Sequence, residues 1–285
     1  MTRNGDDVNG ELRERLVHEL TASPSYLLSE EDAAFLEGPT ARPARLLLEM
    51  MRPEYYLQRR GINSTVVVFG SARVVSPAQA AAGLREAEAA AAAAPGDPAP
   101  AAALREARLR VRYSHYYDEA RHLARALACV CRTGECRDFV VVTGGGPGIM
   151  EAANRGAWEA GELSLGFNID LPREQRPNPF ISPELAFRFH YFAMRKMHFM
   201  LRARALVAFP GGYGTFDELF EALTLVQTGK IEPIPIVLVG REYWERAIDF
   251  GFLVEEGFIE ARDAALFEVV ETGAEAAALI RRRYT

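Results

Sequence analysis

The sequence is poor in the features that define several classes of protein. Three of its 285 residues are cysteine, which excludes a small fold held together by disulfides. No apolar run approaches the ~18 residues that span a bilayer, and the polar start of the chain lacks the apolar core of a signal peptide. We therefore expect no membrane association and a cytoplasmic location.

An excess of positive charge is also absent. Aspartate and glutamate (39) outnumber lysine and arginine (33), which gives a formal net charge of -6. A net-acidic chain is ill suited to nonspecific binding of nucleic acid, so we expect no nucleic-acid partner. Lysine itself is rare: Lys196 and Lys230 are the two lysines, and arginine supplies the other cations.

The three cysteines, Cys129, Cys131 and Cys136, lie close together in a C-x-C-x4-C pattern. A structural zinc site usually has four ligands at tighter spacing, and no fourth ligand is near. We interpret the three as reduced thiols at the end of a helix and in the following turn. The sequence therefore predicts no metal.

Short β-branched runs alternate with helical stretches from residue 61 onward. Strands are expected at 65–70, 139–143, 164–169, 205–209, 234–239 and 267–270, and helices at 149–160, 184–204, 215–228 and 243–256. This alternation predicts an α/β fold, a Rossmann-like doubly wound parallel sheet of about six strands with helices on both faces. Apolar residues make up 49% of the chain, as is usual for a globular protein.

Two segments depart from this alternation. Residues 1–60 are interpreted as an N-terminal helical extension, with helices at 11–20 and 44–58 and a third that opens with Ser29 as its N-cap. Residues 77–112, rich in alanine and arginine, predict an inserted helical hairpin that serves as a spacer or oligomer contact. The main domain is expected to span residues 61–285.

Two glycine-rich loops follow predicted strands and precede predicted helices. The first contains Gly144, Gly145, Gly146 and Gly148, and the second contains Gly211, Gly212 and Gly214. Glycine lets backbone amides approach a ligand, and a helix N-terminus adds free N–H groups and a favourable dipole for phosphate. Neither loop fits G-x-G-x-x-G or the P-loop pattern, so dinucleotide binding and ATP hydrolysis are not supported.

Charged residues accompany the second loop. Thr215 and Glu218 match a capping box, in which Glu218 ties back the start of the helix. In the alternative, Glu218 lies beside a bound phosphate ligand and stabilises a cation that develops there. Arg195 and Lys196 are adjacent cations in an apolar helical stretch. Either both form structural pairs, or Arg195 reaches the site and Lys196 supports it.

These residues resemble a known family. The stretch 143–157 (TGGGPGIMEAANRGA), the Arg195-Lys196 pair and the stretch 210–218 (PGGYGTFDE) are similar to the LOG ("lonely guy") family. Its members are phosphoribohydrolases of cytokinin riboside 5'-monophosphate, long misnamed lysine decarboxylases. The resemblance covers roughly residues 60–285. The stretches 69–73 and 166–175 look like the longer subgroup of that family, whereas the extension and the hairpin depart from its compact members.

The resemblance implies an enzyme that hydrolyses the N-glycosidic bond of a nucleoside 5'-monophosphate, of the AMP or cytokinin riboside type. The products are a free base and ribose 5-phosphate, without a metal or organic cofactor. By motif, Arg195 and Glu218 match the catalytic pair. The glycines of both loops and Thr215 match phosphate-contacting positions, with Ser71 as a weaker candidate. Supporting positions are Lys196, Asn168 and Asp217. The family also implies a homo-oligomer, at least a dimer.

Other functions fit the same fold. A nonenzymatic nucleotide- or cofactor-binding carrier or sensor is the main alternative, although a pure binder does not need both Arg195 and Glu218. Lysine decarboxylation would require pyridoxal phosphate and a Schiff-base lysine, and neither Lys196 nor Lys230 lies in a recognisable cofactor motif. The preferred base depends on pocket shape, so the sequence leaves it open.

Overall fold

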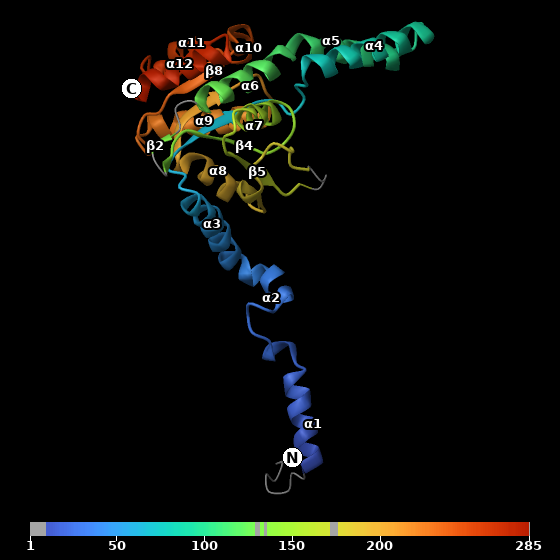
Figure 1. The fold of residues 1–285 in the computed structure, drawn as a ribbon, viewed down its shortest axis with the longest axis vertical. Helices are drawn as coiled ribbons and strands as arrows, with labels where there is room; N and C mark the ends of the chain where they lie inside the picture. The colour runs from blue at the N-terminus through green and yellow to red at the C-terminus, as the bar shows by residue number, and fades with distance from the viewer. Residues whose placement is uncertain (1–9, 129–131, 134–135, 172–175, 285) are drawn as a thin grey trace. The chain divides into compact units, whose positions relative to one another are not determined.

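The protein is described by a computed structural model that covers residues 10–128, 132–133, 136–171 and 176–284 (Figure 1). The chain divides into two compact units, Met1–Met51 and Arg52–Thr285. The division falls inside helix α3 (Arg42–Arg59), whose second half contributes the buried residues Pro53 and Leu57. Among the described residues, no helix combines the length and apolarity needed to cross a bilayer.

The first unit is built from short helices. It contains α1 (Gly10–Thr21), α2 (Ala33–Glu37) and the start of α3, and neither α1 nor α2 has a buried residue. Asp32 caps α2, since its side chain accepts a hydrogen bond from the Phe35 N–H at 2.9 Å. The prediction of Ser29 as the N-cap is therefore wrong, because the helix starts after the last acidic residue of that run.

The second unit contains a seven-stranded sheet in the order β6-β5-β4-β1-β7-β8-β9. All its neighbouring strands pair in parallel. The strands are β1 (Thr65–Phe69), β4 (Val140–Thr143), β5 (Ser164–Ile169), β6 (Ala186–Phe189), β7 (Ala203–Ala208), β8 (Ile236–Val239) and β9 (Glu268–Val270). The central strands are buried on both faces, which is why they read as continuous apolar runs. The predicted α/β fold with a parallel sheet is confirmed.

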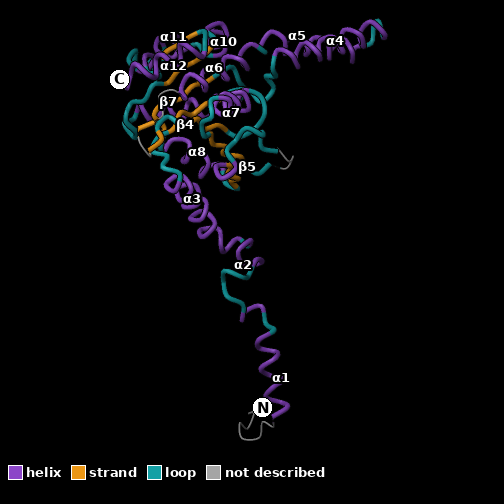
Figure 2. The backbone as a smooth tube through the Cα atoms, viewed as in Figure 1, coloured by secondary structure: helices purple, strands orange, loops and turns teal. Residues whose placement is uncertain are grey.

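Helices cover both faces of this sheet, as Figure 2 shows. Along β1, Val66 and Val68 point to one face and Val67 and Phe69 to the other, because side chains alternate along a strand. One face packs on α6 (His115–Leu127), α7 (Ile149–Glu159) and α12 (Gly273–Tyr284). The other packs on α8 (Phe192–Leu201), α9 (Tyr213–Gln227) and α10 (Arg241–Ala247). The sheet is therefore doubly wound.

Two predicted helices differ from the structure. Within the stretch 184–204, Ala186–Phe189 form edge strand β6, in which Phe187 and Phe189 are buried while Ala186 and Arg188 are exposed. That period of two is a strand pattern, so a helix across the whole stretch was wrong. The stretch 243–256 is broken into α10 and α11 (Phe250–Glu255), and Asp249 caps α11 through the Phe252 N–H at 2.9 Å.

The alanine-rich insertion forms two helices, α4 (Pro77–Ala93) and α5 (Pro98–Tyr113), which pack against each other. Ser76 and Gln79 form a capping box at the start of α4, and the Asp97 side chain caps α5. Each helix has a single buried residue, an alanine. A short antiparallel pair, β2 (Arg132–Thr133) and β3 (Cys136–Arg137), follows α6.

Candidate active site

Three loops meet where the neighbouring strands β4, β1 and β7 end. The Ser71 N–H, just after β1, donates to the Pro210 carbonyl at 3.0 Å, and the Ile149 N–H donates to the Ser71 carbonyl at 3.2 Å. The backbone of Ser71 thus ties the two glycine loops together. This edge is where an open parallel sheet binds its ligands.

The first glycine loop runs against Asn168 and Ser71. Gly145 and Gly148 have φ values of 71° and 74°, a region that L side chains rarely adopt. A Cβ at Gly145 would overlap the Asn168 side chain, and one at Gly148 would overlap the Ser71 carbonyl. Glycine is required at both positions for two reasons, backbone conformation and lack of space. The predicted residues Asn168 and Ser71 therefore lie directly against the first loop.

The amides of this loop are not all free for a ligand. The Gly145 N–H donates to Thr143 Oγ1 at 3.0 Å, and the Ile149 N–H is bonded to Ser71. Proline 147 has no N–H. Within the described part of the chain, the Gly146 and Gly148 N–H groups have no hydrogen-bond acceptor. These two N–H groups can therefore donate to a ligand, and the phosphate contacts of this loop, Gly144 included, stay a prediction.

Helix α9 begins within the second loop, before Thr215, whereas a capping box would make Thr215 the residue just before the helix. Gly212 is the N-cap residue, so Thr215 is the third residue of the helix, and its N–H donates to the Gly212 carbonyl at 2.9 Å. The interpretation of Glu218 as a partner in a capping box is therefore wrong. Thr215 is buried and fills the space beside Gly211, whereas Gly212 and Gly214 are exposed.

The structure brings Arg195 on α8 and Glu218 on α9 face to face. Arg195 Nη2 lies 3.6 Å from Glu218 Oε1, and the two side chains are 15% and 5% exposed. This separation is longer than a hydrogen bond, and Arg195 Nε is buried with no hydrogen-bond partner among the residues that the structure describes. The rings of Phe192 and Phe199 flank the guanidinium at 5.0 and 5.8 Å. Both charged groups therefore retain capacity for a ligand.

Burial controls the protonation of this pair. It raises the pKa of Glu218 to about 7, even though Lys196 and Arg195 favour the carboxylate. Burial also lowers the pKa of Arg195, against the attraction of Glu218. A carboxyl group that titrates near neutrality in a buried site is suited to general acid or base chemistry.

Lys196 points to a different set of carboxylates. Its Nζ lies 2.8 Å from Asp217 Oδ1 and 3.2 Å from Glu221 Oε2. Burial lowers the pKa of Lys196, but the hydrogen bond to Asp217 and the other carboxylates outweigh it and raise the pKa overall. A lysine held in the ammonium form is a poor nucleophile, so it is unsuited to a Schiff base. Lys196 and Asp217 join α8 to α9 beside Glu218.

Three supporting residues were not predicted. Glu221 shares Lys196 with Asp217. The Tyr243 hydroxyl, from α10, donates to the Gly211 carbonyl in the second loop. Asn178 contacts the carbonyl of Gly146 in the first loop. None has a local sequence signal, because each acts through a contact made by folding.

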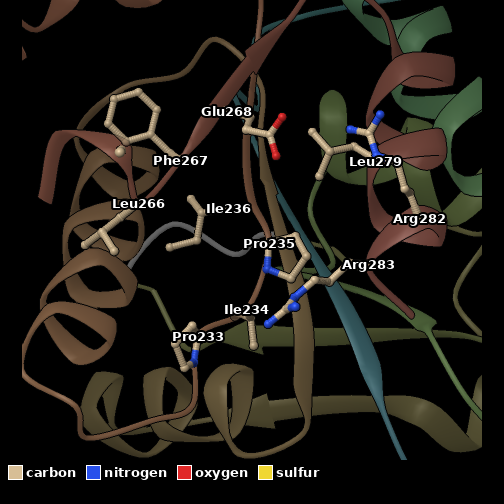
Figure 3. Close-up of a pocket in the computed structure, with 11 residues that line it drawn as sticks. Pro233, Ile234, Pro235, Ile236, Leu266, Phe267, Glu268, Leu279, Arg282 and Arg283 are labelled. Atoms are coloured by element: carbon tan, nitrogen blue, oxygen red, sulfur yellow. The ribbon is translucent and has the colours of Figure 1, made fainter. Parts of the chain in front are cut away.

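Figure 3 shows an open pocket of about 320 Å³ that contains none of the predicted site residues. It is lined by residues that precede or start β8 and β9, such as Pro235 and Phe267, and by Arg282 and Arg283 of α12. The glycine loops follow the carboxyl ends of their strands, so this pocket belongs to the opposite edge of the sheet.

Among the described residues, no group of three or more His, Cys, Asp or Glu side chains is placed to hold a metal ion. The predicted thiols of Cys129 and Cys131 lie outside the described residues, as does the Cys136 side chain.

The fold and the site define a Rossmann-type α/β protein with two glycine loops beside a buried arginine–glutamate pair. Residues 150–280 match a family model described as "Possible lysine decarboxylase". A cytokinin riboside 5'-monophosphate phosphoribohydrolase of Arabidopsis thaliana is 29% identical over 51% of this chain and 66% of its own length. A probable enzyme of the same name from Oryza sativa subsp. japonica is 30% identical over 49% of this chain and 61% of its own length.

These matches confirm the resemblance of this chain to the LOG family. The chain spans less than two thirds of the length of these curated relatives. Among solved structures, a structural-genomics target matches with a TM-score of 0.48 and 22% identity, over 77% of this chain and 99% of the other. A Moco carrier protein from Chlamydomonas reinhardtii matches with a TM-score of 0.41 and 22% identity, over 59% of this chain and 86% of the other. Both likenesses are too weak to indicate a function.

Proposed function

We propose that the protein hydrolyses the N-glycosidic bond of a nucleoside 5'-monophosphate and releases a free base and ribose 5-phosphate. The observation that carries the proposal is the buried Glu218, 3.6 Å from Arg195, beside the edge where two glycine loops meet. The names of the curated relatives support the reaction class. AMP and cytokinin riboside 5'-monophosphates are the proposed substrate types.

The glycine loops provide the phosphate site in this proposal. Backbone N–H groups at Gly146, Gly148 and Gly214 lie at the starts of α7 and α9, where the helix dipole also favours an anion. Binding energy from the phosphate fixes the ribose relative to Glu218, which lowers the entropic part of the barrier. The phosphate thereby contributes to rate although it takes no part in bond cleavage.

Glu218 acts on the ribose carbon in this mechanism. As the C1'–N bond breaks, its electron pair leaves with the base and positive charge develops on the ribose, as in glycoside hydrolysis. The Glu218 carboxylate stabilises that charge and accepts a proton from the water that bonds to C1'. The departing nitrogen takes up a proton from solvent, and Glu218 releases the proton it accepted, so that the sum is the addition of one water across the C1'–N bond. A pKa of about 7 leaves Glu218 able to accept a proton near neutral pH.

Arg195 supplies a fixed cation on the other side of the pair. Its buried Nε has no hydrogen-bond partner in the described part of the chain, so the guanidinium can donate to an oxygen of the phosphate or ribose, or to the departing base. Each of these roles stabilises negative charge or an electron-rich atom. The same guanidinium also keeps part of the Glu218 population ionised.

Product analysis by liquid chromatography tests this proposal. Purified protein is incubated with AMP, a cytokinin riboside monophosphate, GMP, CMP and UMP, beside Glu218→Gln and the matched control Glu232→Gln. Glu232 is exposed and outside the loops. We expect release of free base that falls about 10²–10⁴-fold in Glu218→Gln and is unchanged in Glu232→Gln. Nucleotide binding without base release would favour the carrier or sensor instead.

A further inference from the structure

The first glycine loop is held from behind by Asn178, a residue of the segment that leads toward β6. The Asn178 N–H donates to the Gly145 carbonyl at 2.8 Å, and its side-chain Nδ2 donates to the Gly146 carbonyl at 3.0 Å. Asn178 is 6% exposed. Two successive carbonyls of the loop are thus fixed by one residue that lies 32 positions from Gly146 in sequence.

Because the peptide bond is planar, the contact with the Gly145 carbonyl also fixes the direction of the next N–H group in the loop. In a trans peptide, the carbonyl of one residue and the N–H of the next point in opposite directions. Because the Gly145 carbonyl points at Asn178, the Gly146 N–H points away from it. That N–H has no acceptor among the described residues, so it remains available to a ligand.

A buried polar network fixes the orientation of the Asn178 side chain. Its Nδ2 also donates to Asn154 Oδ1 at 2.9 Å, and its Oδ1 accepts from the Phe180 N–H at 3.2 Å. Asn154 is fully buried and its Oδ1 also accepts from the Thr143 hydroxyl at 2.7 Å. Position 178 must therefore supply a donor, since it faces two acceptor oxygens, the Gly146 carbonyl and Asn154 Oδ1.

We propose that Asn178 is a positioning residue that aims the Gly146 N–H at an oxygen of the substrate's 5'-phosphate. This inference rests on the proposed function and deepens it, because it assigns the phosphate subsite of the first loop. Asn178 acts through the loop and does not touch the reacting atoms. Its loss weakens binding of the phosphate group and leaves the chemistry at C1' to Glu218 and Arg195.

The test measures binding of ribose 5-phosphate by calorimetry and the steady-state constants for AMP. Asn178→Asp replaces a donor with an acceptor of nearly the same shape, and Asn178→Ala removes the side chain. Ser164→Ala is the matched control: the buried Ser164 hydroxyl donates to the Phe180 carbonyl at 2.9 Å in the same segment, away from the glycines of the first loop. Thermal unfolding of each variant reports its stability.

We expect both Asn178 variants to bind ribose 5-phosphate about 10- to 100-fold more weakly, the size of one lost charge-assisted hydrogen bond. KM for AMP rises by a similar factor while kcat changes little, because the other loop N–H groups still hold the phosphate and position the ribose, and Ser164→Ala binds as the original protein does. Unchanged binding in Asn178→Asp, an equal loss in Ser164→Ala, or failure of both Asn178 variants to fold would overturn the inference.

The same experiment separates this inference from the proposed function. If the original protein binds ribose 5-phosphate but releases no base from any nucleotide, the hydrolase proposal fails while the loss in the Asn178 variants still supports the subsite. If it hydrolyses AMP and the Asn178 variants bind normally, the subsite fails alone. If it does not bind ribose 5-phosphate, the subsite is contradicted, and base release from AMP still decides the hydrolase proposal separately.

Discussion

At the scale of single residues, the burial of Glu218 has a consequence for stability. Its pKa is raised from 4.5 to about 7, so between these values the folded protein binds a proton that the unfolded chain has released. Stability therefore falls as pH rises from about 4.5 to 7 and stays level above that range. We predict that Glu218→Gln removes this fall and is more stable than the original protein at pH 8, by at most about 3 kcal/mol.

Urea unfolding between pH 4.5 and 8 measures this difference. The exposed Glu232→Gln should follow the original protein at every pH, because Glu232 lies in water. If Glu218→Gln lost stability at pH 8 relative to the original protein, the carboxylate would be a net stabilising group. The account of a destabilised, poised carboxyl would then be incorrect.

The two lysines of the chain provide a variant and its control for measuring how turnover depends on pH. If the Glu218 carboxylate is the active form, kcat/KM rises with pH to a plateau above about 7. Lys196 lowers the pKa of Glu218, so Lys196→Gln should shift the midpoint of that rise to higher pH. The exposed Lys230→Gln should leave it in place. A midpoint that moves down, or equally in both variants, would speak against the assigned charges.

Local patterns indicated part of the site. The glycine loops and the acidic residue after them are signalled within a few positions of one another, and the structure brings Arg195 and Glu218 together. Their catalytic roles stay a prediction. Asn178 and Tyr243 carry no such signal, because each contacts a loop 32 positions away. Such partners are determined by how strands and helices pack, which a local pattern does not contain.

At the scale of elements, the central strands were predictable because double burial demands continuous apolar residues. Edge strand β6 was not, since its four residues alternate between buried and exposed and run directly into a helical stretch. The break between α10 and α11 depends on one capping side chain, Asp249. The predicted Thr215 cap was wrong because Gly212, three residues earlier, is the N-cap of α9.

The first glycine loop gives a prediction at this scale. Gly145 and Gly161 share a positive φ, 71° and 73°, but a Cβ would overlap Asn168 at Gly145 and meet nothing at Gly161. Gly161→Ala should cost roughly 1 kcal/mol from backbone strain. Gly145→Ala should lower the free energy of unfolding by about 2–3 kcal/mol, because overpacking against Asn168 adds to the backbone strain. It should also weaken ribose 5-phosphate binding.

Thermal unfolding and calorimetry of these two alanine variants provide the check. Equal destabilisation would mean that the packing of Asn168 against the loop is unimportant. Retained ligand affinity in Gly145→Ala would mean that the loop shape does not govern phosphate binding.

At the scale of the whole molecule, exposed apolar side chains point to self-association. In the first unit, α1 exposes Leu16, Val17 and Leu20 and buries no residue. In the second, α8 exposes Phe192, Met197 and Leu201. We predict a homo-oligomer, at least a dimer, with a mass by light scattering of about twice the 31.6 kDa of the chain or more. A monomer over the micromolar range would contradict this prediction.

The proposed reaction breaks the bond between ribose and base. The most direct measurement is a time course of AMP with the purified protein at pH 8, in which every product is quantified by liquid chromatography. We predict adenine and ribose 5-phosphate in equal amounts, with release nearly abolished in Glu218→Gln and retained in Glu232→Gln. Adenosine with inorganic phosphate would mean that a different bond is cleaved. If AMP and cytokinin riboside monophosphate both stay intact, the hydrolase proposal is contradicted.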